Sequence, residues 1–263
     1  MKPWRFIYSG LCDPYTNMAI DEAILLNYSS GRVLPTLRIY GWNPPAFSIG
    51  YSQKAEEVLD LERCKKEGVL FVRRITGGGI IFHHLEVTYS LTCFKQEINA
   101  FGSVKDGFKI ICSFLLNTYK KLGLIPHFAI DIKPPALGKS PFCFSSYEDY
   151  DIMVGGKKIG GNAQKRKRDL IFQHGSIPLE LKTDIFMPYL RNKIDGLEEK
   201  VCSLTEALGR EITFEELADT IKKSFKETFS IDLIEQGLIP EEEKLALKLK
   251  KEKYATDDWN LKR

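Results

Sequence analysis

Residues 73–84 read RRITGGGIIFHH and carry three consecutive glycines between two apolar segments. Because glycine has no Cβ, a ligand can lie directly against the backbone N–H groups of such a run. The paired Arg73 and Arg74 would offer positive charge at the rim of this loop. A glycine-rich hairpin turn between two strands is the alternative, since glycine runs are also common in turns. The segment therefore indicates either a ligand-binding loop or a plain turn.

A cysteine and a lysine further along the chain could support nucleophilic chemistry. Cys143 follows a stretch rich in Pro, Gly and Ser and precedes the polar segment 145–150, so we expect it in an exposed loop. A thiol attacks as the thiolate, and a lysine ammonium beside it lowers the pKa of the thiol. Lys158 could return to this loop from a paired strand. Spacing alone does not show contact, so a nucleophilic and an inert Cys143 both stay open on this reasoning.

The histidines and two glycine-containing segments exclude other chemistries. His83 and His84 are adjacent, so on a strand they point to opposite faces, and no carboxylate motif joins them and His174 into a metal site. We therefore expect no metal. A serine triad is not indicated, because no G-x-S-x-G is present. The tripeptide at 138–140 resembles the end of a P-loop but lacks the earlier glycine, and 155–161 lacks the dinucleotide spacing.

Composition and charge define the class of protein. Of 263 residues, 43% are apolar and 11% aromatic, which predicts a packed globular chain. Lys and Arg number 38 and Asp and Glu 35, so the net charge of +3 excludes a strongly basic nucleic-acid binder. Six cysteines without C-x-x-C spacing favour reduced thiols. No apolar run approaches the roughly 18 residues of a membrane helix, and no signal-type segment opens the chain, so we expect a cytoplasmic protein without membrane association.

Lysine and arginine residues are locally dense at 157–158 and 165–168. On a solvated hairpin edge, such residues protect a strand from pairing with other chains. The alternative is a docking patch for an acidic protein, which would speed encounter more than it would tighten binding.

The elements that must position these residues alternate between helix and strand patterns. Thr16 is a candidate cap for a first helix, whose apolar residues recur at four-residue spacing through Tyr28. A helical period also runs from Phe108 to Tyr119. Five short β-branched or aromatic segments, separated by Pro or Gly turns, read as strands. These predicted strands are 37–42, 46–51, 70–75, 80–83 and 87–94.

A hairpin is predicted at 151–159, because Gly155 and Gly156 can take the positive φ angles of a primed turn. The segment 170–179 can extend its sheet.

The chain becomes helical from about residue 182. Thr213 with Glu216 forms a capping box, and Pro240 opens another helix. No shift in composition separates this part from the rest. We predict one α+β domain over residues 1–263, with a mixed, largely antiparallel sheet flanked by helices and a helical C-terminal part.

Two motifs resemble the lipoate and octanoate protein ligase and transferase superfamily, whose fold also underlies biotin protein ligases. The segment 73–83, R-R-x-T-G-G-G-x-x-x-H, resembles the substrate-binding loop of that family, and 158–164, K-I-x-G-x-A-Q, resembles its lysine motif. Both motifs are specific, and the resemblance covers most of the chain. It implies substrate-binding roles for Arg73, Arg74, Thr76, Gly77, Gly78, Gly79, His83, Gly161 and Ala163.

Further segments are similar to the cysteine-dependent octanoyltransferases of the LipM type. They are 83–90 (H-x-x-E-x-T-Y-S), Cys143 after Pro141-Phe142, 173–176 (Q-H-G-S) and a terminal Tyr254 with Trp259-Asn260. Adenylating lipoate ligases have no need of a cysteine at the position of Cys143. Two residues depart from the pattern: Gly79 is arginine in many LipM-type sequences and glycine in the ligases, and His84 replaces an aspartate common to both.

The resemblance implies a ping-pong transfer from octanoyl-acyl carrier protein to a lysine of a lipoyl domain, such as the glycine cleavage H protein. Cys143 would hold octanoate as a thioester, and Lys158 would lower the pKa of the thiol and could stabilise the oxyanion. No metal or cofactor is needed, and we expect a monomer. The alternatives are an ATP-dependent lipoate ligase, an amidotransferase between lipoyl domains and a non-catalytic binder of such domains.

Overall fold

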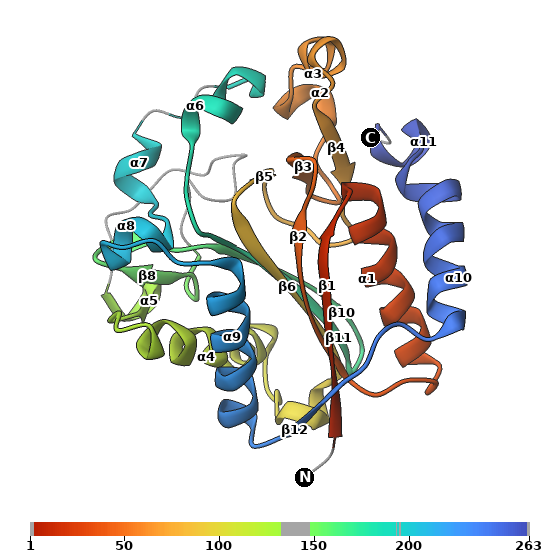
Figure 1. Cartoon of the computed structure of the whole chain (residues 1–263), viewed down its shortest axis with the longest axis vertical. Helices are drawn as coiled ribbons and strands as arrows, with labels where there is room; N and C mark the ends of the chain where they lie inside the picture. The colour runs from red at the N-terminus through yellow and green to blue at the C-terminus, as the bar shows by residue number, and fades with distance from the viewer. Residues whose placement is uncertain (1–2, 133–147, 193, 195, 262–263) are drawn as a thin grey trace.

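The computed structural model describes residues 3–132, 148–192, 194 and 196–261. At its centre lies a six-stranded sheet with the strand order β10-β11-β6-β2-β1-β12 (Figure 1). β2 and β12 run parallel to β1, and the other three neighbouring pairs are antiparallel. The predicted mixed, largely antiparallel sheet is therefore confirmed. Its strands are β1 (Pro3–Cys12), β2 (Thr36–Trp42), β6 (Glu86–Phe94), β10 (Gly161–Lys167), β11 (Leu170–Pro178) and β12 (Asp232–Glu235).

The glycine loop joins two strands of a small sheet, β4 (Leu70–Arg73) and β5 (Ile81–His83). Both pair with β3 (Ala46–Ile49), which lies between them, parallel to β4 and antiparallel to β5. The loop therefore crosses over an intervening strand. This arrangement excludes the plain hairpin turn that the glycine run also allowed.

The hairpin predicted at 151–159 is confirmed. β8 (Ile152–Val154) and β9 (Lys157–Lys158) pair in antiparallel fashion, and Gly155 and Gly156 between them have φ angles of 57° and 82°. Together with β7 (His127–Phe128), they form a second small sheet.

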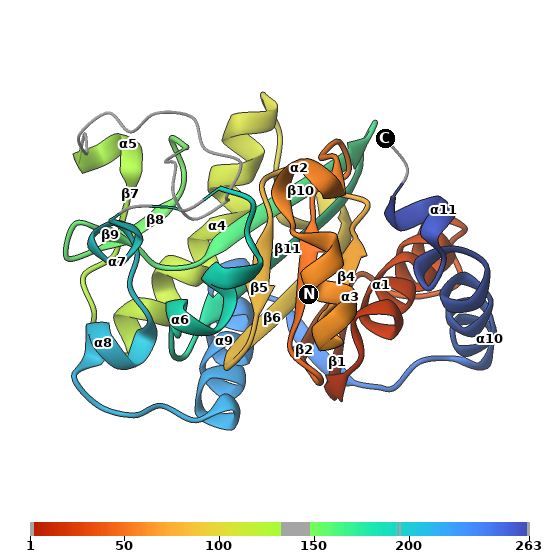
Figure 2. The ribbon, with the colours of Figure 1, turned by 90° about the horizontal axis from the view of Figure 1, so that it is seen from above.

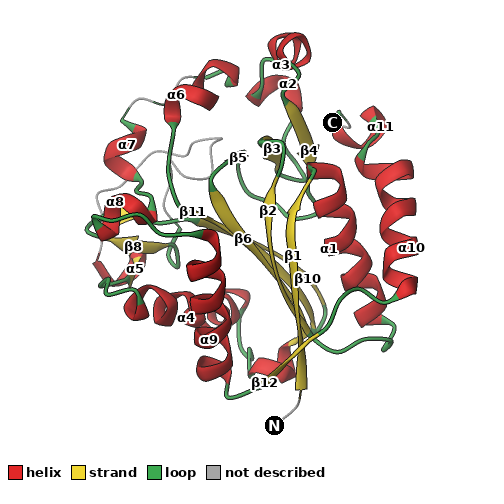
Figure 3. Cartoon of the chain, in the orientation of Figure 1, coloured by secondary structure: helices red, strands yellow, loops and turns green. Residues whose placement is uncertain are grey.

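Helices cover both faces of the central sheet. On one face α1 (Pro14–Ser29) packs beside α10 (Pro240–Leu249), and on the other α4 (Val104–Lys121) packs beside α9 (Phe214–Phe229). Figure 2 shows the two helix pairs on opposite sides of the sheet. The shorter helices surround them (Figure 3): α2 (Ala55–Val58), α3 (Leu61–Glu67), α5 (Ala129–Ile132), α6 (Thr183–Phe186), α7 (Leu197–Lys200), α8 (Leu204–Leu208), α11 (Asp257–Asn260), the 3₁₀ turns at Lys95–Ile98 and Met187–Tyr189, and a π-helical turn at Lys250–Tyr254.

Alternation along the strands divides the core into two layers. Neighbouring residues Phe6 and Ile7 of β1 enter different apolar clusters, because successive side chains of a strand point to opposite faces. The first cluster also holds Phe225 of α9, and the second holds Ile24 of α1. Among the described residues, no helix is both long enough and apolar enough to span a membrane.

The first helix begins before the predicted cap. Asp13 is the N-cap, because its carboxylate accepts hydrogen bonds from the backbone N–H groups of Tyr15 and Thr16, each at 3.1 Å. Pro14 occupies the first helical position, where a missing N–H carries no penalty. The prediction that Thr16 caps this helix is therefore wrong.

Three strands of the central sheet, β1, β10 and β12, are absent from the predicted strands. β12 interrupts the C-terminal part that we predicted to be helical, and it pairs with β1 at the edge of the sheet. β1 itself carries the charged Arg5 inside an apolar run. Arg5 is buried there because Glu242 of α10 accepts two hydrogen bonds from its guanidinium, at 2.6 and 2.7 Å.

Candidate active site

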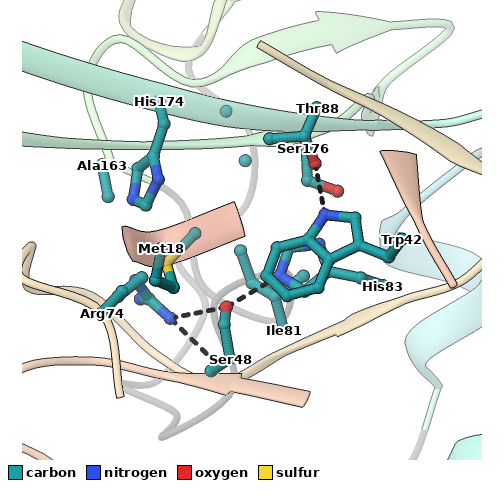
Figure 4. Close-up of a pocket in the computed structure, with 12 residues that line it drawn as sticks. Met18, Trp42, Ser48, Arg74, Ile81, His83, Thr88, Ala163, His174 and Ser176 are labelled. Atoms are coloured by element: carbon teal, nitrogen blue, oxygen red, sulfur yellow. Dashed lines mark hydrogen bonds between the residues drawn. The ribbon is translucent and has the colours of Figure 1, made fainter. Parts of the chain in front are cut away.

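A narrow cavity lies where the central sheet meets α1 and the sheet that carries the glycine loop. Its volume is about 20 Å³, which holds little more than one water molecule. Four of the residues that we predict to bind substrate, Arg74, His83, Gly161 and Ala163, line it. Figure 4 shows His174 on one side of the cavity and the stacked rings of Trp42 and His83 on the other. The remaining lining residues are Met18, Ser48, Ile81, Thr88, Gly175 and Ser176.

The Arg74 guanidinium organises the glycine loop. It donates hydrogen bonds to the backbone carbonyls of Gly77 at 2.8 Å, Gly79 at 2.6 Å and Ser48 at 2.9 Å. Only 1% of Arg74 is exposed, so the expectation that it offers charge at the rim is wrong. With two of its carbonyls held by Arg74, the loop leaves Gly77 and Gly78 exposed to a ligand. Gly78 has a φ of 93°, a conformation that favours glycine.

Arg73 joins the end of the chain to the base of the loop. Its guanidinium donates to the backbone carbonyls of Trp259 at 3.0 Å and Asn260 at 2.8 Å, and to three carbonyls within residues 50–53. Arg73 is also 1% exposed, so its expected place at the rim is wrong as well. The reason is physical: its partners are backbone groups far away in the sequence, which a local motif does not show.

His83 is buried and held on three sides. Its ring stacks on Trp42, with 3.8 Å between the ring centroids and 8° between the planes. Nε2 lies 2.7 Å from the Ser48 hydroxyl oxygen, and Nδ1 lies 3.1 Å from Glu86 Oε1, out of line for a hydrogen bond. Glu86 accepts hydrogen bonds from two hydroxyl groups of the cavity wall. These contacts fix the ring as part of the wall.

A buried row of polar groups links the glycine loop to α1. Thr76 Oγ1 lies 2.7 Å from His174 Nε2, and His174 Nδ1 lies 3.9 Å from Asp21 Oδ2. Burial lowers the pKa of His174, so its ring is neutral near pH 7. Burial opposes ionisation of Asp21, but Arg38 at 2.8 Å and the Ser90 hydroxyl at 2.7 Å outweigh it, and the pKa of the Asp21 carboxyl lies below its ordinary value.

The lysine motif contains a buried ammonium. Lys158 Nζ lies 2.7 Å from Asp151 Oδ2, and the lysine side chain is 2% exposed. The same carboxylate oxygen accepts a hydrogen bond from the backbone N–H of Glu148 at 2.8 Å. Three residues after Lys158, the chain enters β10, whose first residue Gly161 lines the cavity. Cys143 lies outside the described residues.

Four described cysteines are unsuited to nucleophilic attack. Burial raises the pKa of Cys64 to about 11 and that of Cys202 to about 12. It raises the pKa of Cys93 and Cys112 further. A thiol with such a pKa contains almost no thiolate at pH 7. These four cysteines are buried, apolar side chains.

Within the described part of the chain, no group of three or more His, Cys, Asp or Glu side chains could hold a metal ion. His83 is buried in the cavity wall, whereas the adjacent His84 is partly exposed, in agreement with their expected opposite faces.

Sequence reasoning missed two acidic residues of the site. Asp151 was assigned to the hairpin without a role, although strand alternation puts it on the same face as Met153, and Met153 pairs with Lys158. That register was the available signal. Asp21 had no signal of its own, because its partner Arg38 lies on a strand that only the fold brings close.

The fold and the glycine loop define a class of protein. Residues 13–226 match the lipoyl protein ligase A/B catalytic domain, and the chain belongs to that family. Among curated relatives, Octanoyltransferase LipM of Geobacillus kaustophilus is 37% identical over 276 residues, covering 99% of this chain and 98% of the relative. Octanoyltransferase LipM of Bacillus subtilis is 34% identical over 278 residues, covering 100% and 99%.

Solved structures agree with this membership. A lipoate-protein ligase A bound with ATP is 27% identical, with a TM-score of 0.82 and 99% of each chain covered. The bipartite lipoate protein ligase of Thermoplasma acidophilum is 25% identical, with a TM-score of 0.82, covering 100% of this chain and 98% of that one. The predicted fold class is confirmed.

Proposed function

We propose that the chain is an octanoyltransferase that moves an octanoyl group from an acyl carrier protein thioester to a lysine amine of a lipoyl domain. The observation that carries the proposal is similarity over the whole chain to proteins named Octanoyltransferase LipM, at 37% and 34% identity. The exposed glycine loop and the buried Lys158, three residues before the cavity-lining Gly161, supply groups that such a transfer needs.

The proposed transfer has two steps with Cys143 as the nucleophile. Its thiolate attacks the carbonyl carbon of the carrier thioester, a new C–S bond forms, the old one breaks and the departing carrier thiolate takes up a proton. The acceptor amine then attacks the enzyme thioester, and an amide forms as the Cys143 thiolate leaves. Because a lysine amine has an ordinary pKa near 10.4, it must lose a proton before this attack. The covalent intermediate divides one difficult transfer into two easier ones.

Lys158 is the second catalytic residue in this scheme. Its ammonium stabilises the thiolate and the oxyanion of each tetrahedral intermediate, a donor role typically worth about 3 kcal/mol of barrier. Asp151 keeps that ammonium in place through the 2.7 Å contact. Asp151 therefore acts as a positioning residue.

We assign the octanoyl tail to the cavity. Burial of each methylene contributes roughly 0.8 kcal/mol, so the depth of the cavity can select chain length. The present volume of about 20 Å³ requires widening, and Met18, an unbranched and flexible side chain on the wall, is the residue best able to move. In this proposal Thr76, Gly77, Gly78, Gly79, His83, Gly161 and Ala163 surround the acyl group, while Arg73 and Arg74 support the loop from behind.

We also propose the molecular setting. The acceptor is a lipoyl domain such as the glycine cleavage H protein, residues 1–263 act as one acyltransferase domain, and the protein works in the cytoplasm as a monomer without metal or organic cofactor. In support of a lipoyl-domain acceptor, the Thermoplasma acidophilum ligase structure is described together with its E2 lipoyl domain.

An ATP-dependent lipoate ligase is the second candidate. The TM-score of 0.82 against a ligase bound with ATP favours it. In such an enzyme Lys158 would contact an acyl-adenylate and Cys143 would have no role. An amidotransferase between lipoyl domains is a variant of the first candidate, because the same cysteine would attack an amide donor.

Mass analysis of the acceptor separates these candidates. The protein is incubated with a lipoyl domain and either octanoyl-carrier protein without ATP or free octanoate with ATP. We expect octanoylation only with the carrier protein, and its loss in the Cys143→Ser variant. A requirement for ATP, or full transfer by Cys143→Ser, would overturn the proposal in favour of a ligase.

A further inference from the structure

A groove of about 590 Å³ runs beside the glycine loop, between α1 and the end of the β10–β11 hairpin. Figure 2 shows the end of this hairpin on the side of the sheet that α1 covers. The floor of the groove is apolar and includes Leu25, Leu26, Ile75 and Phe94. Leu26 is 44% exposed. One side of the groove, which we name the basic wall, consists of Lys165, Lys167 and Arg168.

The groove lies on the same face of β10 as the acyl cavity. Side chains alternate along a strand, so Lys165 and Lys167 share the face of Ala163, which lines the cavity. A rise of about 3.3 Å per residue puts Lys167 about 13 Å along the strand from Ala163. Arg166 points to the opposite face, where its guanidinium lies against Gly107 of α4.

The positive charge of the basic wall is open to a partner. Its three side chains are exposed, and among the described residues none of them forms an ion pair. The two carboxylates that line the groove are held by other lysines: Glu22 lies 2.7 Å from Lys253, and Asp169 lies 2.7 Å from Lys95. The groove therefore combines an apolar floor with positive charge along one edge.

Arg168 occupies an unfavourable backbone position. With Asp169 it forms the two-residue turn of the hairpin, and its φ is 56°, in the left-handed region that favours glycine or asparagine. Glycine would relieve this strain. An arginine there instead presents its charge at the tip of the hairpin, and strained residues that persist often serve a function.

We propose that this groove docks the acyl donor, an acidic, helical carrier protein. Apolar residues of one of its helices lie on the floor, and its carboxylates face the basic wall. This inference rests on the proposed function. The far end of the basic wall, with Lys167 about 13 Å along β10 from Ala163, suits a donor that delivers its acyl group on a long prosthetic arm. An acceptor lysine has a shorter reach, so its domain must sit directly over the cavity.

The test measures binding and the two half-reactions separately. The triple variant K165E/K167E/R168E is compared with the unaltered protein. We expect the Kd for holo-carrier protein, measured by fluorescence anisotropy at low salt, to rise at least tenfold. Adduct formation from octanoyl-carrier protein slows to the same extent. Adduct formation from octanoyl-pantetheine, and discharge of the adduct to a lipoyl domain, stay unchanged.

Two control variants separate the effect of the basic wall from the effects of total charge and of backbone strain. The variant K66E/K120E/K223E changes the net charge by the same amount, but at three exposed lysines elsewhere on the surface. We expect its Kd for the carrier protein to change by less than twofold. R168G removes one cation and also relieves the strained φ angle. It should bind the carrier protein several-fold more weakly although its Tm is equal to or above that of the unaltered protein.

Several results would contradict the docking proposal. An unchanged Kd for K165E/K167E/R168E would do so, as would equal weakening by the control triple. If only discharge to the lipoyl domain slows, the groove belongs to the acceptor. The absence of any adduct with both donors would refute the proposed function instead, while the anisotropy measurement would still decide whether the groove binds carrier protein.

Discussion

Asp151 forms an ion pair with the buried ammonium of Lys158, and the proposed reaction does not consume this carboxylate. Removing one partner of a buried ion pair leaves an uncompensated charge, which typically costs 3–5 kcal/mol, whereas replacing both partners by neutral groups is often tolerated. The pair of Asp151 and Lys158 can therefore be tested for stability and for chemistry separately.

We expect Asp151→Asn to lower the free energy of unfolding by about 3 kcal/mol, because the buried ammonium of Lys158 loses this ion pair. The double variant D151N/K158M should recover most of that loss and yet fail to transfer octanoate. Urea unfolding and a single-turnover transfer assay measure the two effects. Full activity of the double variant would remove Lys158 from the mechanism.

The neutral His174 gives the protein a defined dependence on pH. Its pKa in the folded state lies below the unfolded value near 6.5, so the unfolded chain binds a proton first as pH falls. The stability that this group contributes is present above pH 6.5 and is lost below it. We expect the free energy of unfolding to fall between pH 7.5 and 5.5 on account of this residue, by at most about 1.4 kcal/mol, the limit set by the unfolded pKa. His174→Gln should reduce the fall by that amount, and an identical fall in the variant would contradict the assignment.

At the scale of elements, substitutions at Gly175 and Gly77 allow stability and activity to be tested separately, because an added side chain is crowded at the first position and unobstructed at the second. A Cβ at Gly175 in β11 would lie 2.2 Å from Asn162 Oδ1 and 2.5 Å from Tyr89 Cε1, so Gly175→Ala must displace these two side chains, which are hydrogen-bonded to each other. We expect a loss of about 2 kcal/mol, as for other overpacked sites.

A Cβ at Gly77 would meet nothing within 4 Å. Gly77→Ala should therefore unfold within about 0.5 kcal/mol of the unaltered protein but slow adduct formation, because a methyl group would stand where the ligand approaches the loop. Thermal unfolding and adduct kinetics check both variants. Normal kinetics in a stable Gly77→Ala would show that the loop does not hold substrate.

The sequence patterns predicted those elements that are determined by interactions between residues close together in the chain. The helix through Phe108 and the hairpin at 151–159 follow from the period of apolar residues and from a Gly-Gly turn. β1 was missed because Arg5 breaks the apolar run and finds its partner in α10. For the site, the glycine-loop and lysine motifs indicated which residues lie near one another in the fold. That Arg73 is buried against the carbonyls of Trp259 and Asn260 needed the tertiary structure, since these partners are distant in the chain.

At the scale of the whole molecule, the two ends of the chain support each other. Arg5 near the start binds Glu242 in α10, and Arg73 at the loop binds the segment after it through Trp259 and Asn260. The glycine loop is therefore coupled to α10 through the C-terminal segment.

Glu242→Ala should lower the free energy of unfolding by 3–5 kcal/mol, because it leaves the buried charge of Arg5 without its carboxylate. The neighbouring Glu243→Ala is the control, since Glu243 is exposed and should change stability by less than about 0.5 kcal/mol. Urea unfolding of both variants measures the difference. Equal effects would show that the buried pair does not anchor the C-terminal part.

The intact mass of the protein after mixing with octanoyl-carrier protein, in the absence of ATP and of any acceptor, tests the central claim most directly. We predict a gain of one octanoyl group, mapped to Cys143 by peptide analysis, lost in Cys143→Ala and discharged when a lipoyl domain is added. An unmodified protein that still octanoylates the acceptor, or an adduct that persists in Cys143→Ala, would contradict the account.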